Sequence, residues 1–170
     1  MMSKNKKMVL LALFVAQALV LSIVESFIPV PVGIPGVKLG LANIITMVVI
    51  MFFGLKEGLV VVIIRCLLSS LFAGGPMIFL FSVAGGVLSA LVMYFLHSRL
   101  SRLFSTIGIS IAGAVAHNIG QILIALVTLQ TLSVLSYLPV LMISGIIMGC
   151  FVGLCSMFLS RTLKKLNILN

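Results

Sequence analysis

Residues 57–75 read EGLVVVIIRCLLSSLFAGG, in which the apolar run that follows Glu57 contains one charged side chain, Arg65, near its middle. The next charged residue along the chain is Arg99. Runs of about 20 apolar residues match the bilayer's hydrocarbon thickness of about 30 Å, and runs near that length recur through the chain. The sequence therefore predicts an all-α integral membrane protein, in which the burial of Arg65 needs an explanation.

The composition supports a membrane protein. Of 170 residues, 62% are hydrophobic and 8% are charged, whereas about a quarter of the residues of a soluble domain are charged. The net charge of +9 would suggest nucleic-acid binding in a soluble chain, but here the basic residues cluster at the ends of apolar runs. We therefore expect a membrane-lipid environment and no nucleic-acid partner.

Six spans can be drawn within a single transmembrane domain that covers residues 1–170. The N-terminal KNKK and the apolar stretch after it resemble a signal peptide, but the run continues to Ile28 and is too long for one, so we expect a retained first span. With the N-terminus inside, nine basic residues lie in cytoplasmic segments and only Lys38 lies outside, which predicts that both termini are cytoplasmic. The expected spans are residues 8–28, 39–53, 58–72, 77–96, 106–129 and 137–160.

Two stripes of small residues indicate how the spans pack. The last span carries Gly145, Gly149 and Gly153 at four-residue spacing, and the fourth carries a similar stripe of Ser82, Gly86 and Ala90. Small side chains let helix backbones approach closely in lipid. We interpret both stripes as packing inside the bundle in preference to a surface for a partner.

Several polar residues are expected at the depth of Arg65, in the middle or outer half of the membrane. Ionisable groups inside a bilayer are functional-site candidates by default. We predict a ligand pocket that opens outward, and two alternatives stay open: Glu25 only neutralises Arg65 while the amides satisfy each other, or Glu25 and His117 form a proton or ion relay. The candidate substrate-binding residues at this level are Glu25, Asn43, Arg65, His117, Asn118 and Gln121.

Catalytic signatures are missing from the sequence. Glu25 and Glu57 are the two acidic residues, and the chain contains no paired-carboxylate motif, P-loop, G-x-S-x-G or H-E-x-x-H. The three cysteines lack C-x-x-C spacing and are expected to be packing residues. We expect no enzymatic activity, no catalytic residue, no cofactor and no metal.

Three blocks of the sequence carry a family resemblance. They are K-L-G-L-A-N at 38–43, R-x-L-L-S-S at 65–70 and G-A-V-A-H-N-x-G-Q at 113–121. Over residues 29–153 the chain resembles the bacterial membrane family called Gx transporter or heptaprenyl diphosphate synthase component I. This resemblance implies a multi-pass protein of the bacterial plasma membrane.

That family is in turn similar to the substrate-binding S-components of energy-coupling factor (ECF) importers. Such proteins have six helices, and an A-x-x-x-A motif in the first helix docks onto a transmembrane coupling subunit that two ATPases drive. Ala12 and Ala16 match this motif. The resemblance thus implies partner docking at these alanines, with the coupling subunit and the ATPase subunits supplied in trans, and a small-molecule substrate held in the outer half of the membrane.

The sequence restricts the substrate only in its charge. Arg65 and Lys38 favour an anionic, vitamin- or cofactor-like molecule, because a buried guanidinium offers paired donors to an anion. The synthase label fits less well, since prenyl diphosphate synthases use aspartate-rich Mg²⁺ sites and this chain contains no aspartate. An accessory membrane subunit of polyprenyl diphosphate synthesis and a small proton-linked carrier are the alternative functions.

Overall fold

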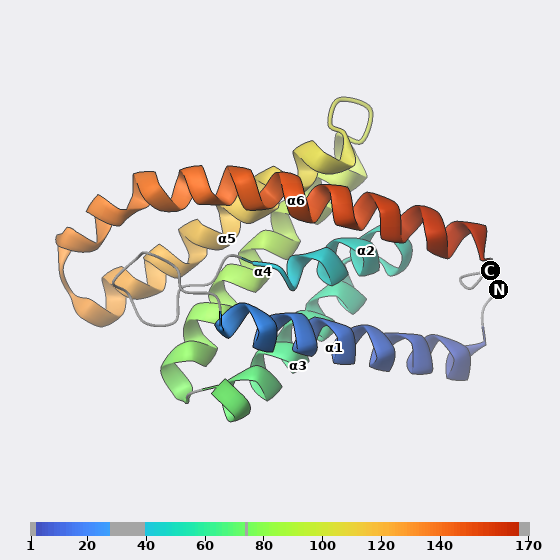
Figure 1. The fold of residues 1–170 in the computed structure, drawn as a ribbon, viewed down its shortest axis with the longest axis horizontal. Helices are drawn as coiled ribbons and strands as arrows, with labels where there is room; N and C mark the ends of the chain where they lie inside the picture. Colours follow the sequence, from blue (N-terminus) through green and yellow to red (C-terminus); the bar gives the residue numbers. More distant parts are fainter. Residues whose placement is uncertain (1–2, 28–39, 74, 167–170) are drawn as a thin grey trace.

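The computed structural model describes residues 3–27, 40–73 and 75–166, and within these ranges it consists of helices with no strand (Figure 1). The all-α prediction is therefore confirmed. Lys38 lies outside the described residues. The elements are α1 (Lys4–Ser26), α2 (Asn43–Phe53), α3 (Leu55–Ala73), α4 (Pro76–Arg99), α5 (Thr106–Leu129), the short 3₁₀ helix η1 (Leu132–Tyr137) and α6 (Leu138–Lys165).

Four segments of the described chain are long and apolar enough to cross a membrane: Lys4–Glu25, Pro76–Arg99, Thr106–Leu129 and Leu132–Lys165. Helix α2 differs because its 11 residues extend only about 16 Å, which is short of a full crossing. Helix α3 differs because three charged residues, Lys56, Glu57 and Arg65, interrupt its apolar sequence. The chain is thus a helical membrane protein, and the count of six spans stays a prediction.

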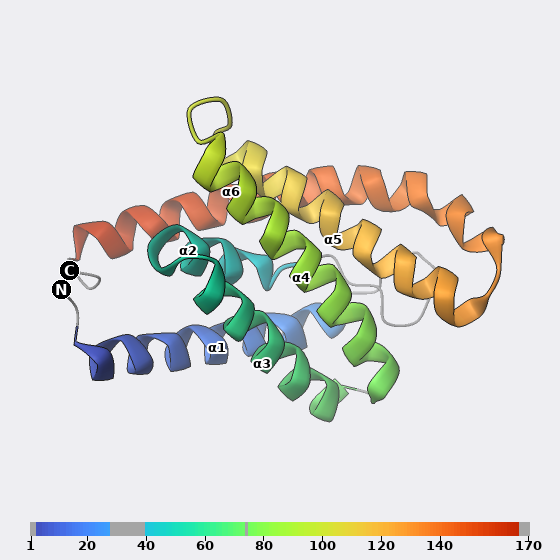
Figure 2. The same ribbon diagram turned by 180° about the vertical axis from the view of Figure 1, so that it is seen from behind.

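Helix α2 forms the centre of the bundle. It contacts each of the other five α-helices, and its residues 43–50 are all buried. Around it, α1 packs against α3, α3 against α4, α4 against α5, and α5 against α6 (Figures 1 and 2). The circle does not close, because no Cα atom of α1 lies within 8 Å of a Cα atom of α6 among the described residues. The fold is an open ring of five helices around a short central helix.

Glycines close the seam between α5 and α6 and the seam between α3 and α4. A Cβ atom at Gly149 would lie 2.6 Å from Ile111 Cα, and one at Gly153 would lie 2.7 Å from Ile107 Cα. On α4, a Cβ atom at Gly86 would lie 2.7 Å from Val62 Cγ1. The prediction that both small-residue stripes pack inside the bundle is confirmed.

The start of α1 and the end of α6 lie at one end of the long axis, and η1 lies at the other end (Figure 1). At the terminal end, Lys7 of α1 forms a salt bridge with Glu57 of α3. The Lys7 ammonium also lies 5.9 Å from the ring centre of Phe53, and that of Lys164 lies 5.7 Å from the ring of Phe52. Glu57 therefore has a charged partner from a helix that lies far from it in the sequence.

Candidate functional site: a buried polar layer

Arg65 lies on the buried face of α3. Its side chain is 3% exposed, whereas Ile63, Ile64 and Leu67 on the opposite face are 39–50% exposed. This is the expected arrangement for an ionisable residue in a membrane helix, which faces the bundle interior while apolar side chains face lipid. The charge is therefore placed inside the ring of helices.

The hydrogen bonds of the guanidinium to described residues go to neutral groups on neighbouring helices. Nη1 donates to Ser22 Oγ of α1 at 3.1 Å, and Nη2 donates to Asn43 Oδ1 of α2 at 3.5 Å. Gly86 of α4 lets the group approach, since a Cβ atom there would lie 3.1 Å from Nη2. The Nε–H has no hydrogen-bond partner among the described residues. Arg65 is thus held in position by three helices and keeps one donor open.

Glu25 connects the end of α1 to the start of α2. Its side chain is 2% exposed, and its Oε1 accepts a hydrogen bond from the backbone N–H of Gly40. Gly40 has φ +90°, a backbone conformation that residues other than glycine rarely adopt, and a Cβ atom there would lie 3.0 Å from Asn43 Nδ2. Among the described residues, Glu25 is thus hydrogen-bonded to Gly40, whereas Arg65 is hydrogen-bonded to Ser22 and Asn43.

His117 of α5 lies at the same level and is 3% exposed. A Cβ atom at Gly85 would be 3.0 Å from His117 Nδ1, and one at Gly40 would be 3.9 Å from its Cδ2. Because Gly85 and Gly86 are consecutive, His117 and Arg65 lie against adjacent residues of α4. The imidazole, the guanidinium and the Asn43 amide thus belong to one polar layer between α2, α3, α4 and α5.

Gln121 follows His117 by four residues and lies on the same face of α5. Its side chain is 0% exposed, and neither Oε1 nor Nε2 has a hydrogen-bond partner among the described residues. The Nδ2 atom of Asn43 is likewise buried without a partner there. Buried polar groups in this condition need an explanation, such as a bound molecule or ordered water.

Asn118 has a different position from the one that the sequence suggests. Its Nδ2 donates to Leu141 O of α6 at 2.5 Å, and a Cβ atom at Gly145 would lie 2.7 Å from the same nitrogen. A step of one residue turns a helix by about 100°, so Asn118 faces α6 while His117 and Gln121 face the layer. In this structure Asn118 connects α5 to α6.

Sequence reasoning missed Ser22, which is 1% exposed and accepts from Arg65. Its spacing of three residues before Glu25 places both on one face of the first helix, and this spacing was the available signal. A serine in an apolar helix is common enough that the spacing alone did not separate it from a packing residue.

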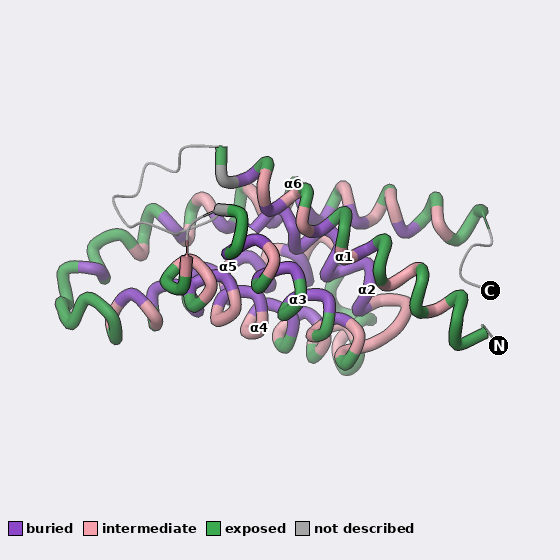
Figure 3. Tube along the Cα trace, turned by 90° about the horizontal axis from the view of Figure 1, so that it is seen from below, coloured by how far each residue is buried: buried purple, intermediate pink, exposed green. Residues whose placement is uncertain are grey.

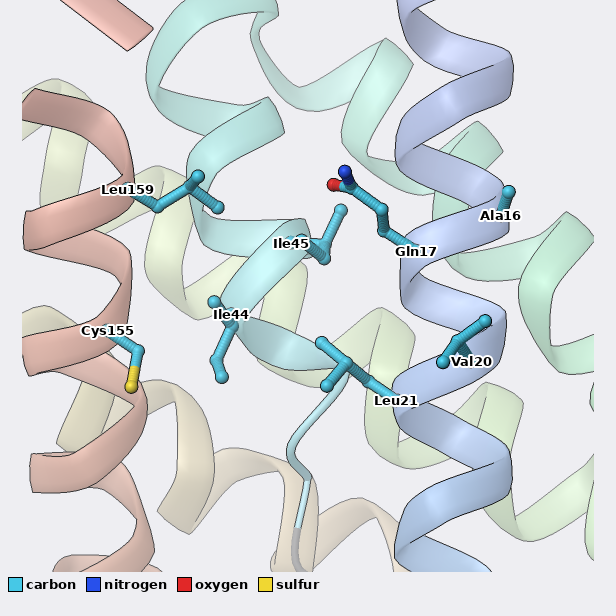
Figure 4. A pocket seen from close by; sticks show the side chains of 8 residues that line it. All are labelled: Ala16, Gln17, Val20, Leu21, Ile44, Ile45, Cys155 and Leu159. Atoms are coloured by element: carbon cyan, nitrogen blue, oxygen red, sulfur yellow. The ribbon is translucent and has the colours of Figure 1, made fainter. Parts of the chain in front are cut away.

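A second feature is an apolar groove where the ring of helices is open. It has a volume of about 560 Å³ and lies over α2 between α1 and α6 (Figure 4). Ala16, one of the two alanines of the A-x-x-x-A motif, lines it, and Ala12 is exposed on the same helix. Its lining includes Ala16, Gln17 and Leu21 of α1, Ile45 of α2, and Cys155 and Leu159 of α6.

The fold and its polar interior define a small helical membrane protein with a buried charged site. Within that class, the chain belongs to the heptaprenyl diphosphate synthase component I family, whose model matches residues 14–159. The match includes Arg65, Asn43, His117 and Gln121, so the polar layer lies within the family region. Neither the search of curated proteins nor the search of solved structures found a match.

Proposed function

We propose that this chain is the substrate-binding membrane subunit of an ECF-type importer, which captures a small anionic molecule from outside the bacterial cell. The observation that carries the proposal is the buried Arg65, whose hydrogen bonds go to a hydroxyl and an amide and whose Nε–H is open. A guanidinium with an open donor in a low-dielectric site favours a ligand that supplies negative charge.

The position of α2 supports an anionic ligand. The helix begins at Asn43, beside Arg65, and has no side-chain N-cap. A helix N-terminus carries a partial positive charge, and transporters use interrupted helices inside the membrane to direct such ends at anionic groups. Arg65 and the start of α2 therefore contribute positive potential to the same place.

The proposed topology has six spans with both termini in the cytoplasm. Helix α2 would lie in the second crossing, and α3 would make the third with Arg65 facing inward. The charge distribution supports this orientation, and the start of α1 and the end of α6 lie together at the end opposite η1, as this topology requires (Figure 1). Single cysteines at Ser133 and Ser98 test it: the first should be labelled from outside and the second only after permeabilisation, whereas equal labelling in intact cells would contradict it.

The proposed partner is a transmembrane coupling subunit with its ATPases, docked at the opening between α1 and α6. Ala12 and Ala16 are both exposed, and the groove beside Ala16 is apolar and floored by α2 (Figure 4). Small exposed side chains allow close approach of a partner helix in lipid. On this proposal the chain itself is not an enzyme and hydrolyses no ATP.

The principal test uses protein extracted from its own membrane. Native mass spectrometry of the purified wild-type chain should detect a retained small molecule that Arg65→Met loses. An affinity tag on the chain should co-purify a transmembrane subunit with ATPases. An apo wild-type spectrum together with no co-purifying ATPase would refute the importer function.

The alternative function is an accessory subunit of heptaprenyl diphosphate synthesis, which the name of the family favours. It predicts a stable complex with a soluble synthase and release of diphosphate from isoprenoid substrates that depends on this chain. A proton-linked carrier is the other alternative, because Glu25 and His117 are titratable and buried in the layer. Substrate accumulation that collapses with a protonophore while ATP is maintained would support the carrier.

A further inference from the structure

The open hydrogen-bonding atoms of the polar layer differ in kind. Gln121 presents an acceptor, Oε1, and a donor, Nε2, side by side on one planar amide, and neither has a partner among the described residues. Arg65 Nε and Asn43 Nδ2 are donors only. The layer therefore offers a ligand two chemically distinct sets of atoms. The first edge is the acceptor and donor of Gln121, and the second edge is the two donors, Arg65 Nε and Asn43 Nδ2.

The Gln121 edge accepts a narrow range of groups. Both Oε1 and Nε2 of Gln121 form hydrogen bonds only if the ligand places an acceptor next to a donor, as in a lactam, an imide or a primary amide. An anion alone would accept from Nε2 and leave Oε1 buried without a donor. Exchange of the oxygen and nitrogen of the Gln121 amide gives the same donor–acceptor pair, so either orientation of the amide recognises the same groups.

The second edge consists of Arg65 Nε and Asn43 Nδ2 and offers hydrogen-bond donors only. Asn43 Oδ1 accepts from Arg65 Nη2, which directs Asn43 Nδ2 as a donor toward Gly40 and His117. Together with Arg65 Nε it favours an acceptor group such as a carboxylate. His117 lies beside this edge, and Gln121 follows one turn along α5, so one small molecule can extend from the first edge to the second.

We propose that the ligand of the polar layer joins an anionic acceptor group to a lactam- or imide-type edge, and that Gln121 recognises this edge. The inference rests on the proposed function, since it names the substrate class of the same site. It assigns Arg65 and Asn43 to the anionic group and makes Gln121 the residue that selects among anions.

Two probes separate these contributions. Orotate carries a carboxylate and ring N–H groups next to carbonyls, whereas 1,3-dimethylorotate keeps the carboxylate and loses both N–H groups. Calorimetric titration of the purified chain in lipid nanodiscs should show orotate binding about tenfold more tightly, since hydrogen bonds of this type have that order of effect on affinity. The difference should disappear in Gln121→Leu and persist in Gln130→Leu, a matched change at an exposed glutamine.

The outcomes are distinguishable. Equal affinity of the two acids for the wild type, or a preference that survives in Gln121→Leu, overturns the substrate class and indicates that water satisfies Gln121. If both acids bind equally and Arg65→Met abolishes both, the class fails while the proposed anion pocket stands. Binding of neither acid counts against both proposals. Should Gln121→Leu lower the unfolding temperature, Gln121→Met gives a second apolar replacement and carries the same expectation.

Discussion

Glu57 and Arg65 lie on the same helix, about two turns apart, and the structure treats them in opposite ways. Glu57 lies at the end of α3, where Lys7 forms a salt bridge with it at the surface. Arg65 lies within the ring of helices, and its hydrogen bonds go to Ser22 and Asn43, both neutral. Glu57, which has access to water, has a charged hydrogen-bond partner, whereas the hydrogen-bond partners of the buried Arg65 among the described residues are neutral.

From this difference we interpret Glu57 as a structural charge and Arg65 as a functional one. A surface ion pair contributes little to stability, and apolar residues of similar volume can often replace a buried ion pair with little loss. Stability alone therefore gives no reason to keep Arg65 in the interior. The predictions below begin with the charge in the interior and end with the pair at the surface.

Arg65→Met should have the largest effect. We expect it to abolish uptake at normal membrane abundance and to weaken binding of an anionic probe about 10- to 100-fold, because hydrogen bonds to charged groups have that effect. His117→Ala and Gln121→Ala should weaken binding less, since neutral hydrogen bonds contribute about half as much. Lys56→Met is the matched control, which removes one positive charge from α3 outside the layer.

The double replacement Glu25→Gln with Arg65→Met decides between ligand binding and simple neutralisation. If the two residues only balance each other, the double variant should be stable and fully active. If Arg65 holds the ligand, the double variant should insert and fold but fail to bind. Wild-type uptake by the double variant would leave Arg65 as a structural ion.

Gly149→Leu should destabilise the fold strongly. The backbone of Ile111 lies 2.6 Å from the position of the new Cβ atom, so α5 and α6 must separate. Overpacking of this kind lowers the free energy of unfolding by about 1–3 kcal/mol or more. Thermal unfolding in detergent measures it, with Ile147→Leu, on the exposed face of α6, as the control. An unchanged midpoint would mean that this seam does not hold the bundle together.

Ala12→Leu with Ala16→Leu should reduce co-purification of the coupling subunit and leave ligand retention intact. The reason is steric, because leucine at these exposed positions would keep a partner helix away from α1. Ala84→Leu provides the control, since Ala84 lines a different groove, between α4 and α5. Undiminished co-purification by the double variant would show that the alanines are ordinary surface residues.

The sequence predicted the helices well because apolar runs and their breaks are local features. The span expected over 106–129 coincides with α5, and Arg65 was recognised as a buried charge. The central position of α2 could not be predicted, since a helix buried among protein helices and one that faces lipid are equally apolar. Its residues 43–50 are buried on all sides, whereas α1 exposes Val9, Leu13 and Val20 (Figure 3).

The candidate site was predicted in outline and not in its contacts. The spacing of His117 and Gln121 placed them together, but adjacency in the sequence also drew in Asn118, which the structure turns toward α6. Ser22 was missed, and the salt bridge between Lys7 and Glu57 was not predicted. Hydrogen bonds between helices depend on rotation and depth, which a single sequence does not determine.

The smallest expected effect concerns the surface pair of Lys7 and Glu57. The hydrogen bond from Lys7 lowers the pKa of Glu57 below its ordinary value of 4.5. A depressed carboxylate pKa means that the stabilisation is fully present above the unfolded-state pKa and is lost as the pH falls through the folded-state value.

The pair is partly exposed, so it should contribute at most about 1 kcal/mol, and less at high salt. Glu57→Gln should therefore unfold at a slightly lower temperature than the wild type at pH 7, and this difference should shrink as the pH falls through the folded-state pKa of Glu57. Lys7→Met should give the same result without adding to it in the double variant. If the two substitutions instead add independently at pH 7, Lys7 stabilises the fold through the Phe53 ring, from which it lies 5.9 Å, and the salt bridge contributes nothing measurable.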